Sequence, residues 1–248
     1  DVKGRPADNP LITHIADVEQ VESLAASVPP AARTLMDRFF PGPLTLILPR
    51  HPDVPAVVSA GLDTIGVRMP DHALCQQFLA ACDTPVAAPS ANRSGRPSPT
   101  TWEAVQDDLG GRIPCILQGG RTDAGVESTV VDCTGAAPAI LRPGAVTLDQ
   151  LRAALPDTEV APPDADTQAR SPGTKHRHYA PDARVRLVDD PNEAKPGADH
   201  AYIGLTRPDD PDAFGRAFIP DTVEAYAHEL FHFFRTCDAA GCTRIYCQ

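Results

Sequence analysis

The chain has 248 residues, of which 42% are hydrophobic, and this composition suits one large or two smaller folded domains and excludes a disordered chain. Its formal net charge of −11 disfavours a protein that binds nucleic acid through a broad basic surface. No signal peptide or apolar run long enough to cross a bilayer is visible, so we expect a cytoplasmic protein without membrane contact. The seven cysteines are scattered, and reduced thiols are expected.

Strands and helices are expected to alternate through the first part of the chain. The hydrophobic pattern predicts strands over 11–15, 44–48, 64–69, 86–88, 113–117, 128–133 and 139–141. It predicts helices over 17–25, 32–39, 73–82 and 101–109. This alternation is typical of an α/β or α+β sheet domain.

The composition changes after residue 155. Pro, Asp, Ala and Thr without apolar periodicity predict a linker from Leu155 to about Ser171, and the basic, aromatic segment 171–181 indicates a loop that folds back over a site. The remainder predicts strands and one helix, at 185–188, 201–205, 222–237 (the helix) and 243–247. We therefore expect a sheet domain over 1–155, a linker and active-site loop over 156–183, and a small α/β domain over 184–248.

Polar residues crowd the stretch 86–95, directly after a short apolar run. Ser90 and Asn92 offer a hydroxyl and an amide there, and this set suits an anionic or nucleotide ligand as well as it suits an ordinary Asx/Ser turn. Lys3 and Arg5 flank a glycine, so both cations could face a phosphate; a solvated surface pair is the alternative.

Several strand residues could contact a ligand. Thr64 and Arg68 are four residues apart and therefore point to one face of their strand, where they could bind a polar ligand or form a solvated edge. His14 could meet a ligand group or be a satisfied core residue. Ser128 and Arg142 stand at opposite ends of neighbouring strands, and neither is diagnostic alone.

One motif suggests zinc. His228, Glu229 and His232 match H-E-x-x-H, the signature of zinc metallopeptidases. We favour a chance match, because the apolar stripe of this helix already defines its buried side and only Cys237 and Asp238 follow closely as third ligands. No metal-ligating residues are therefore expected.

Six motifs follow one another along the chain, at 3–11, 40–45, 90–92, 128–132, 141–144 and 171–173. In this order they resemble the threonylcarbamoyl-AMP synthases of the YrdC-like family, in the form with a C-terminal small domain, over nearly the whole chain. The resemblance implies a YrdC-like twisted mixed β-sheet domain with flanking helices, plus a small Rossmann-like α/β C-terminal domain. The family's segment before the K-x-R element and the end of its small domain have no match, so we expect a chain truncated at both ends.

The resemblance also implies an activity. The enzyme would be a nucleotidyltransferase, an L-threonylcarbamoyladenylate synthase that converts L-threonine, bicarbonate and ATP, with Mg²⁺, into threonylcarbamoyl-AMP and pyrophosphate. The product serves the t6A37 modification of tRNA, through a downstream tRNA threonylcarbamoyl transferase complex and a possible tRNA contact. A non-catalytic module that binds double-stranded RNA or tRNA is the alternative.

Site residues are carried over from the family motifs. The resemblance implies catalytic roles for Lys3, Arg5, Ser90 and Asn92. It implies ATP contacts for Arg5, Asn9, Thr64, Ser90, Ser98, Arg142, His178 and Tyr179. It implies threonine contacts for His14, Arg68, Ala88 (through its backbone) and Ser128.

Overall fold

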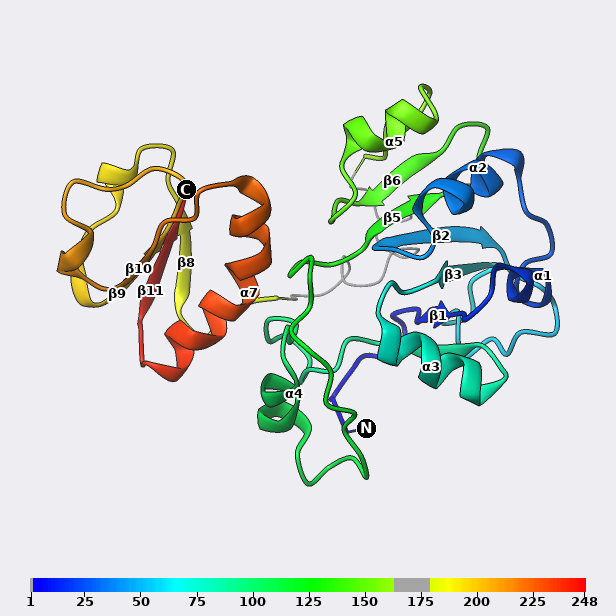
Figure 1. Cartoon of the computed structure of the whole chain (residues 1–248), viewed down its shortest axis with the longest axis horizontal. Coiled ribbons are helices and arrows are strands. Elements are labelled where there is room, and N and C mark those ends of the chain that lie inside the picture. Colours follow the sequence, from blue (N-terminus) through cyan, green and yellow to red (C-terminus); the bar gives the residue numbers. More distant parts are fainter. Residues whose placement is uncertain (1, 163–178) are drawn as a thin grey trace. The chain divides into compact units, whose positions relative to one another are not determined.

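The computed structural model describes residues 2–162 and 179–248 (Figure 1). These residues form two compact units. The described part of the large-sheet unit is 5–89 and 127–162, and that of the small-sheet unit is 2–4, 90–126 and 179–248.

A seven-stranded mixed sheet with the strand order β4-β1-β3-β2-β5-β6-β7 is the centre of the large-sheet unit (Figure 1). The strands are β1 Ile12–His14, β2 Leu44–Pro49, β3 Thr64–Arg68, β4 Val86–Ala88, β5 Thr129–Asp132, β6 Ala139–Arg142 and β7 Glu159–Val160. Parallel and antiparallel pairs alternate across the sheet. The helices are η1 Val18–Gln20, α1 Val21–Leu24, α2 Pro30–Phe39, α3 Ala73–Cys82 and α5 Leu148–Ala154.

Helix ends in this unit follow local sequence signals. Asp17 caps η1 and exchanges hydrogen bonds with Gln20, forming a capping box. Thr147 and Gln150 form the same motif at the start of α5. Pro30 begins α2, where its missing N–H has no intrahelical partner to lose.

The large sheet has an apolar face and a polar face. Side chains alternate along a strand, and Leu44, Leu46 and Leu48 of β2 join a core that contains buried residues of α1, α2 and α5. The opposite side of β2 carries Thr45 and Ile47, and a Cβ placed on Gly66 would lie 3.5 Å and 3.3 Å from their side chains. Helices therefore cover one face, and the second face is free to carry polar side chains.

The small-sheet unit contains a four-stranded sheet with the order β10-β9-β11-β8, and all its pairs are parallel. Its strands are β8 Arg184–Leu187, β9 Gly197–Ile203, β10 Phe214–Phe218 and β11 Arg244–Cys247, and its helices are α4 Trp102–Leu109, η2 Pro191–Glu193, η3 Pro211–Ala213 and α7 Val223–Ala239. Apolar side chains occupy both faces: α7 packs Phe231 and Phe234 on one side, whereas Tyr202 and Tyr246 are buried on the other.

The fold class predicted from the sequence is confirmed, and four local predictions need correction. The expected strand over 113–117 is wrong: these residues form no strand, because Pro114 lacks a backbone N–H and the segment is mostly exposed. Residues Glu159–Val160 of the expected linker form β7 and pair with β6. The sequence analysis missed α5 and β10, although the Thr147 capping box was a readable signal for α5.

In the described part of the chain, none of the helices combines the length and the hydropathy that a bilayer crossing needs.

Candidate functional site

The second face of the large sheet brings together residues from four segments of the chain. We name it the polar face and define it by His14, Thr45, Thr64, Arg68 and Ser128. The parallel register places His14 beside Arg68 at the ends of β1 and β3. The Arg68 Nε donates to the carbonyl oxygen of Gly42 at 3.2 Å, which fixes the guanidinium near the end of its strand.

A buried hydrogen-bond network lies at one end of this face. The hydroxyl oxygens of Thr45 and Ser128 are 2.8 Å apart. Arg142, whose side chain is 9% exposed, donates through Nη2 to the Ser128 carbonyl at 2.7 Å and to the Ser128 hydroxyl at 3.1 Å. The carboxylate of Glu127 lies 3.8 Å from the same nitrogen. Hydroxyls and a guanidinium are thus held in one arrangement by bonds within the fold.

Gly144 allows the chain after Arg142 to pass close to the Ser128 backbone. A Cβ at position 144 would lie 2.4 Å from the Glu127 carbonyl oxygen and 2.5 Å from the Thr129 nitrogen. Such distances are shorter than van der Waals contact, and the opposing atoms belong to the backbone, which cannot rotate away. The R-P-G motif therefore needs glycine for close approach.

The electrostatics of the polar face are dominated by arginine. Burial, together with the charge of Arg68, lowers the pKa of His14 from 6.5 to about 4, so His14 is neutral at pH 7. Burial lowers the pKa of Arg68, Arg142 lowers it further, and Glu127 opposes both effects. Both guanidinium groups remain charged at neutral pH. Two cations, one carboxylate and a neutral imidazole suit a small zwitterion whose carboxylate meets arginine.

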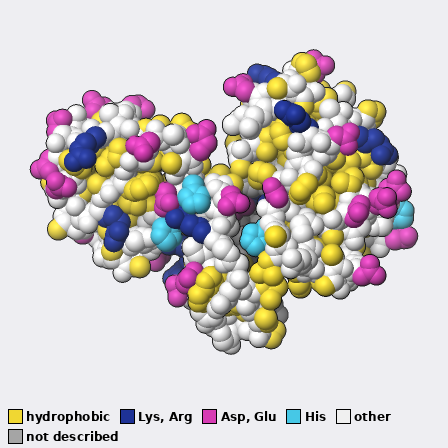
Figure 2. Space-filling model, in the orientation of Figure 1, with side chains coloured by type: hydrophobic (Ala, Val, Ile, Leu, Met, Phe, Trp, Pro, Cys, Tyr) yellow, Lys and Arg dark blue, Asp and Glu magenta, His cyan; other side chains and the backbone are white. Residues whose placement is uncertain are grey.

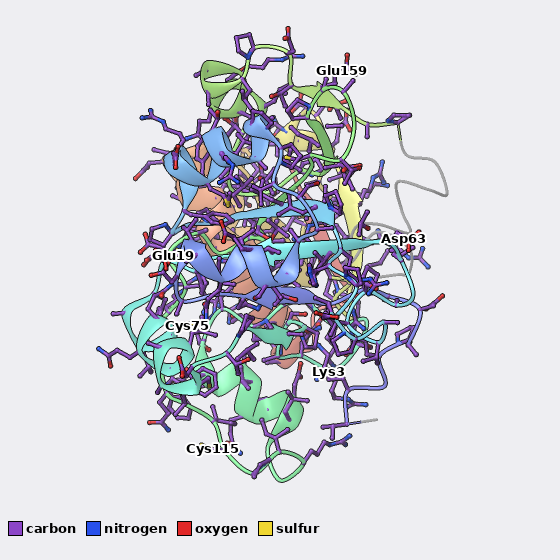
Figure 3. All side chains as sticks on the ribbon, turned by 90° about the vertical axis from the view of Figure 1, so that its right-hand side faces the viewer. Lys3, Glu19, Asp63, Cys75, Cys115 and Glu159 are labelled. Atoms are coloured by element: carbon purple, nitrogen blue, oxygen red, sulfur yellow. The ribbon has the colours of Figure 1, made fainter. Side chains whose placement is uncertain are left out.

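The thiol of Cys75 interacts electrostatically with Arg68 of the polar face. Burial raises the pKa of Cys75, on α3, and Arg68 lowers it in part (Cys75 is labelled in Figure 3). The net shift is upward, so the thiol stays protonated at neutral pH and is no nucleophile there.

Lys3 and the turn Ser90–Arg96 form a second polar cluster, in the small-sheet unit (Lys3 is labelled in Figure 3). Lys3 Nζ donates to the Ser90 carbonyl and, at 3.3 Å, to Asn92 Oδ1. Ser90 Oγ donates to the same Oδ1 at 2.6 Å. Asn92 Nδ2 donates at 2.9 Å to the carbonyls of Arg93 and Arg96. We name Ser90–Arg96 the SxN turn. The Asn92 side chain stabilises this turn through its hydrogen bonds to Ser90, Arg93 and Arg96.

The remaining predicted site residues are spread over both units. Arg5 Nη2 donates to the Pro10 carbonyl at 2.7 Å, and burial lowers the pKa of Arg5 while Asp8 raises it. Asn9 and Ser98 are buried. Ala88 pairs with Ile12 across β4 and β1.

The two predicted site residues of β3 lie at opposite ends of that strand. Thr64 begins β3 and Arg68 ends it. Four residues of strand span about 13 Å, so a ligand the size of threonine cannot contact both side chains.

Tyr179 stacks on Phe231 of α7 with ring centroids 5.4 Å apart. His178 lies outside the described residues.

Sequence reasoning missed three partners of the predicted residues. Thr45, which bonds to Ser128, and Glu127, which faces Arg142, were not named as site residues. Thr45 had a signal, since a lone polar residue among the leucines of 44–48 marks the second face of a buried strand. No signal in the sequence pointed to Asp108.

The zinc alternative finds no support among these contacts. Glu229 forms an ion pair with Arg121 at 2.8 Å, and His228 Nδ1 lies 2.7 Å from the Asp123 carbonyl oxygen. Burial lowers the pKa of His232, and Arg121 lowers it further. Over 2–162 and 179–248 no three His, Cys, Asp or Glu side chains are grouped so that they could hold a metal ion. Two of the three motif side chains, His228 and Glu229, are thus bonded to residues of their own unit.

Comparison with known families gives a match over both parts of the chain. The Sua5/YciO/YrdC family model, described as telomere recombination, matches residues 1–144. The chain belongs to this family. A second model, described as the C-terminal domain of threonylcarbamoyl-AMP synthase, matches residues 146–248. The two-domain form of the family, which the motifs predicted, is thereby confirmed.

Relatives of known name support the same family. The threonylcarbamoyl-AMP synthase of Pyrococcus abyssi is 43% identical over 97% of this chain and 75% of its own length. That of Bacillus subtilis is 49% identical over 76% of this chain, which spans 56% of the relative. The crystal structure of P. abyssi Sua5 complexed with L-threonine superposes with a TM-score of 0.89, at 42% identity, covering 99% of this chain and 76% of that one.

Proposed function

We propose that this chain acts as an L-threonylcarbamoyladenylate synthase, which forms threonylcarbamoyl-AMP and pyrophosphate from L-threonine, bicarbonate and ATP. The observation that carries the proposal is the polar face in a chain of this family, where Arg68 lies beside a neutral His14 and the buried Arg142 holds Ser128. A relative of the same fold binds L-threonine, and it covers nearly all of this chain.

Threonine is proposed to bind on the polar face. Arginine recognises carboxylates through parallel N–H donors, so Arg68 is assigned to the threonine carboxylate. Neutral His14 can both donate and accept, which suits the threonine hydroxyl or amine. Ser128, held by Arg142 and Thr45, and the Ala88 backbone complete the proposed pocket.

ATP is proposed to contact Arg5, Asn9, Thr64, Ser90, Ser98, Arg142, His178 and Tyr179. Catalytic roles are proposed for Lys3, Arg5, Ser90 and Asn92. The threonine amine and bicarbonate form a carbamate, whose oxygen attacks the α-phosphorus and displaces pyrophosphate. Such a reaction needs positioned anions and stabilised phosphate charge, which cationic and hydroxyl side chains supply. Mg²⁺ would arrive with ATP and would be held mainly by phosphates and water.

The cellular setting is part of the proposal. All seven cysteines are free thiols, which is typical of a reducing compartment, and we assign the protein to the cytoplasm. We assign the sheet domain to 1–155, the linker and active-site loop, which contains β7, to 156–183 and the small domain to 184–248. Threonylcarbamoyl-AMP is proposed to pass to a tRNA threonylcarbamoyl transferase complex.

The test is release of pyrophosphate from ATP by the full chain. We expect release only when L-threonine and bicarbonate are both present, and we expect Ser128→Ala to lower it at least tenfold. Thr158→Val is the matched control, because it removes another buried hydroxyl of the same unit, one that donates only to the Leu155 carbonyl.

The outcomes separate the alternatives. Release without threonine, or absence of release together with absence of threonine binding, contradicts the proposal. Binding of tRNA without consumption of ATP would favour an RNA-binding module. Figure 2 weighs against that outcome. Acidic side chains lie over much of the visible face, and the Lys and Arg side chains on that face do not form one broad basic patch.

A further inference from the structure

Asp108 is a buried carboxylate in the small-sheet unit that the proposed reaction does not use. It lies near the end of α4, and its side chain is 0% exposed. Burial alone raises the pKa of Asp108, but hydrogen bonds from Arg235, the Arg93 backbone and Arg96 outweigh this effect and hold the pKa below its usual value. The carboxylate is therefore ionised at neutral pH.

Arg235, on α7, is the main partner of this carboxylate. Its Nη2 donates to Asp108 Oδ2 at 2.7 Å, and its Nη2 and Nε donate to the Pro97 carbonyl at 2.6 Å and 3.1 Å. The Arg235 side chain is only 15% exposed. One guanidinium thus joins α7 both to α4 and to the chain just after the SxN turn.

The same carboxylate reaches the SxN turn directly. The Arg93 N–H donates to Asp108 Oδ2 at 3.0 Å, and Arg96 Nη1 donates to Oδ1 at 3.1 Å. Asn92 bonds to the carbonyls of these two residues and accepts from Ser90 and Lys3, as described above. A continuous path of hydrogen bonds therefore runs from α7 through Asp108 to Lys3, within one compact unit.

A buried ion pair is a poor way to gain stability. Desolvation of two charges consumes most of their attraction, and apolar replacements of similar volume are often as stable. What such a pair supplies is a fixed geometry for the groups bonded to it. Here those groups are the backbone N–H of Arg93, in the middle of the SxN turn, and the carbonyl of Pro97, directly after the turn.

We propose that Asp108 and Arg235 are positioning residues for the adenylation step: they hold the SxN turn and Lys3 in the geometry that binds ATP, and through them α7 of the C-terminal segment contributes to nucleotide binding. This inference rests on the proposed function, because it assigns the SxN turn to ATP. Neither residue touches the substrate.

The chain contains a matched control for a merely structural role. Arg121 and Glu229 also join α7 to the segment 90–126, with a closest distance of 2.8 Å. Arg121 Nη2 also donates to the His228 carbonyl at 3.3 Å, and Glu229 Oε1 lies 3.8 Å from His228 Nε2, so these further contacts involve α7 itself. Loss of this pair weakens the attachment of α7 without touching the SxN turn.

The experiment compares Asp108→Asn and Arg235→Met with Arg121→Met in the full chain. Asp108→Asn keeps the shape of the side chain, so it guards against loss of folding, which circular dichroism checks for each variant. We expect KM for ATP to rise about tenfold in the first two variants, with KM for threonine within about twofold of the parent. Arg121→Met is expected to leave both KM values within about twofold. Arg235→Lys should restore part of the loss, since lysine keeps the charge but not the fork of donors.

Hydrogen exchange at the Arg93 amide gives a readout that does not depend on activity. We expect this amide to exchange at least tenfold faster in Asp108→Asn and at the parent rate in Arg121→Met. Equal changes in all variants, or unchanged exchange and KM in Asp108→Asn, would overturn the inference. If the parent chain releases no pyrophosphate, the proposed function fails by itself, and the exchange comparison still decides whether Asp108 holds the turn.

Discussion

The two sheets of this protein differ in what their faces carry. The large mixed sheet has one face under α1, α2 and α5 and a second face with His14, Arg68 and Ser128. The small parallel sheet has clusters of buried apolar side chains on both faces. Helix α7 of the small-sheet unit forms two charged pairs with the segment 90–126, Arg235–Asp108 and Glu229–Arg121. The difference supports the proposal that the large sheet carries the amino-acid site, whereas the small sheet packs against α7.

Arg142→Met tests the polar face most severely. The variant removes the donors that hold the Ser128 carbonyl and hydroxyl, and it leaves these buried oxygens without a charged partner. We expect kcat/KM for threonine to fall 100-fold to 1,000-fold, measured by pyrophosphate release. Arg152→Met, which removes an exposed arginine of α5 bonded to the Thr158 carbonyl, should change it less than twofold. A similar loss in both variants would contradict the assignment.

His14 predicts how stability depends on pH. Its pKa is about 4 in the fold and about 6.5 when unfolded, so the unfolded chain binds more protons between these values. Stability should therefore fall as the pH drops from about 6.5 to about 4, by roughly 3 kcal/mol from this residue. Urea unfolding at several pH values should show a shallower dependence for His14→Gln. Parallel curves for the two proteins would show that His14 is not the source.

Gly144→Ala tests the close approach behind Ser128. The added Cβ would meet backbone atoms at 2.4 Å and 2.5 Å, so the turn must shift. We expect a loss of about 2 kcal/mol in the free energy of unfolding and a weaker affinity for threonine. Gly135→Ala, where the nearest atom lies 3.6 Å away, is the control and should change stability by less than about 0.5 kcal/mol. Equal effects would refute the packing argument.

The smallest expected effects come from removing single buried hydroxyls of the large-sheet unit, in the variants Thr45→Val and Thr158→Val. Each removes one buried hydroxyl of the large-sheet unit, and each should cost about 1 kcal/mol of stability. Of these two threonines, only Thr45 bonds to Ser128. Thr45→Val alone should therefore weaken threonine binding, by about fivefold in calorimetry. Equal threonine affinity in the two variants would remove Thr45 from the site.

Local patterns in the sequence were sufficient for much of this picture. Alternation along 44–48 and 64–69 predicted buried strands, and the order of the motifs predicted the family. The strand expected over 113–117 failed because an apolar run broken by Pro114 found no neighbour to pair with. The Asp108–Arg235 pair could not be predicted, because its members are 127 residues apart and only the tertiary fold brings them together.

The most direct measurement is a map of backbone amide chemical shifts as L-threonine is added to the full chain. The account predicts that the perturbed amides lie at the His14 end of β1, the Arg68 end of β3 and the Ser128 end of β5, with β8 to β11 unchanged. Perturbations confined to the small sheet, or none at saturating threonine, would contradict the claim that the polar face of the large sheet binds the amino acid.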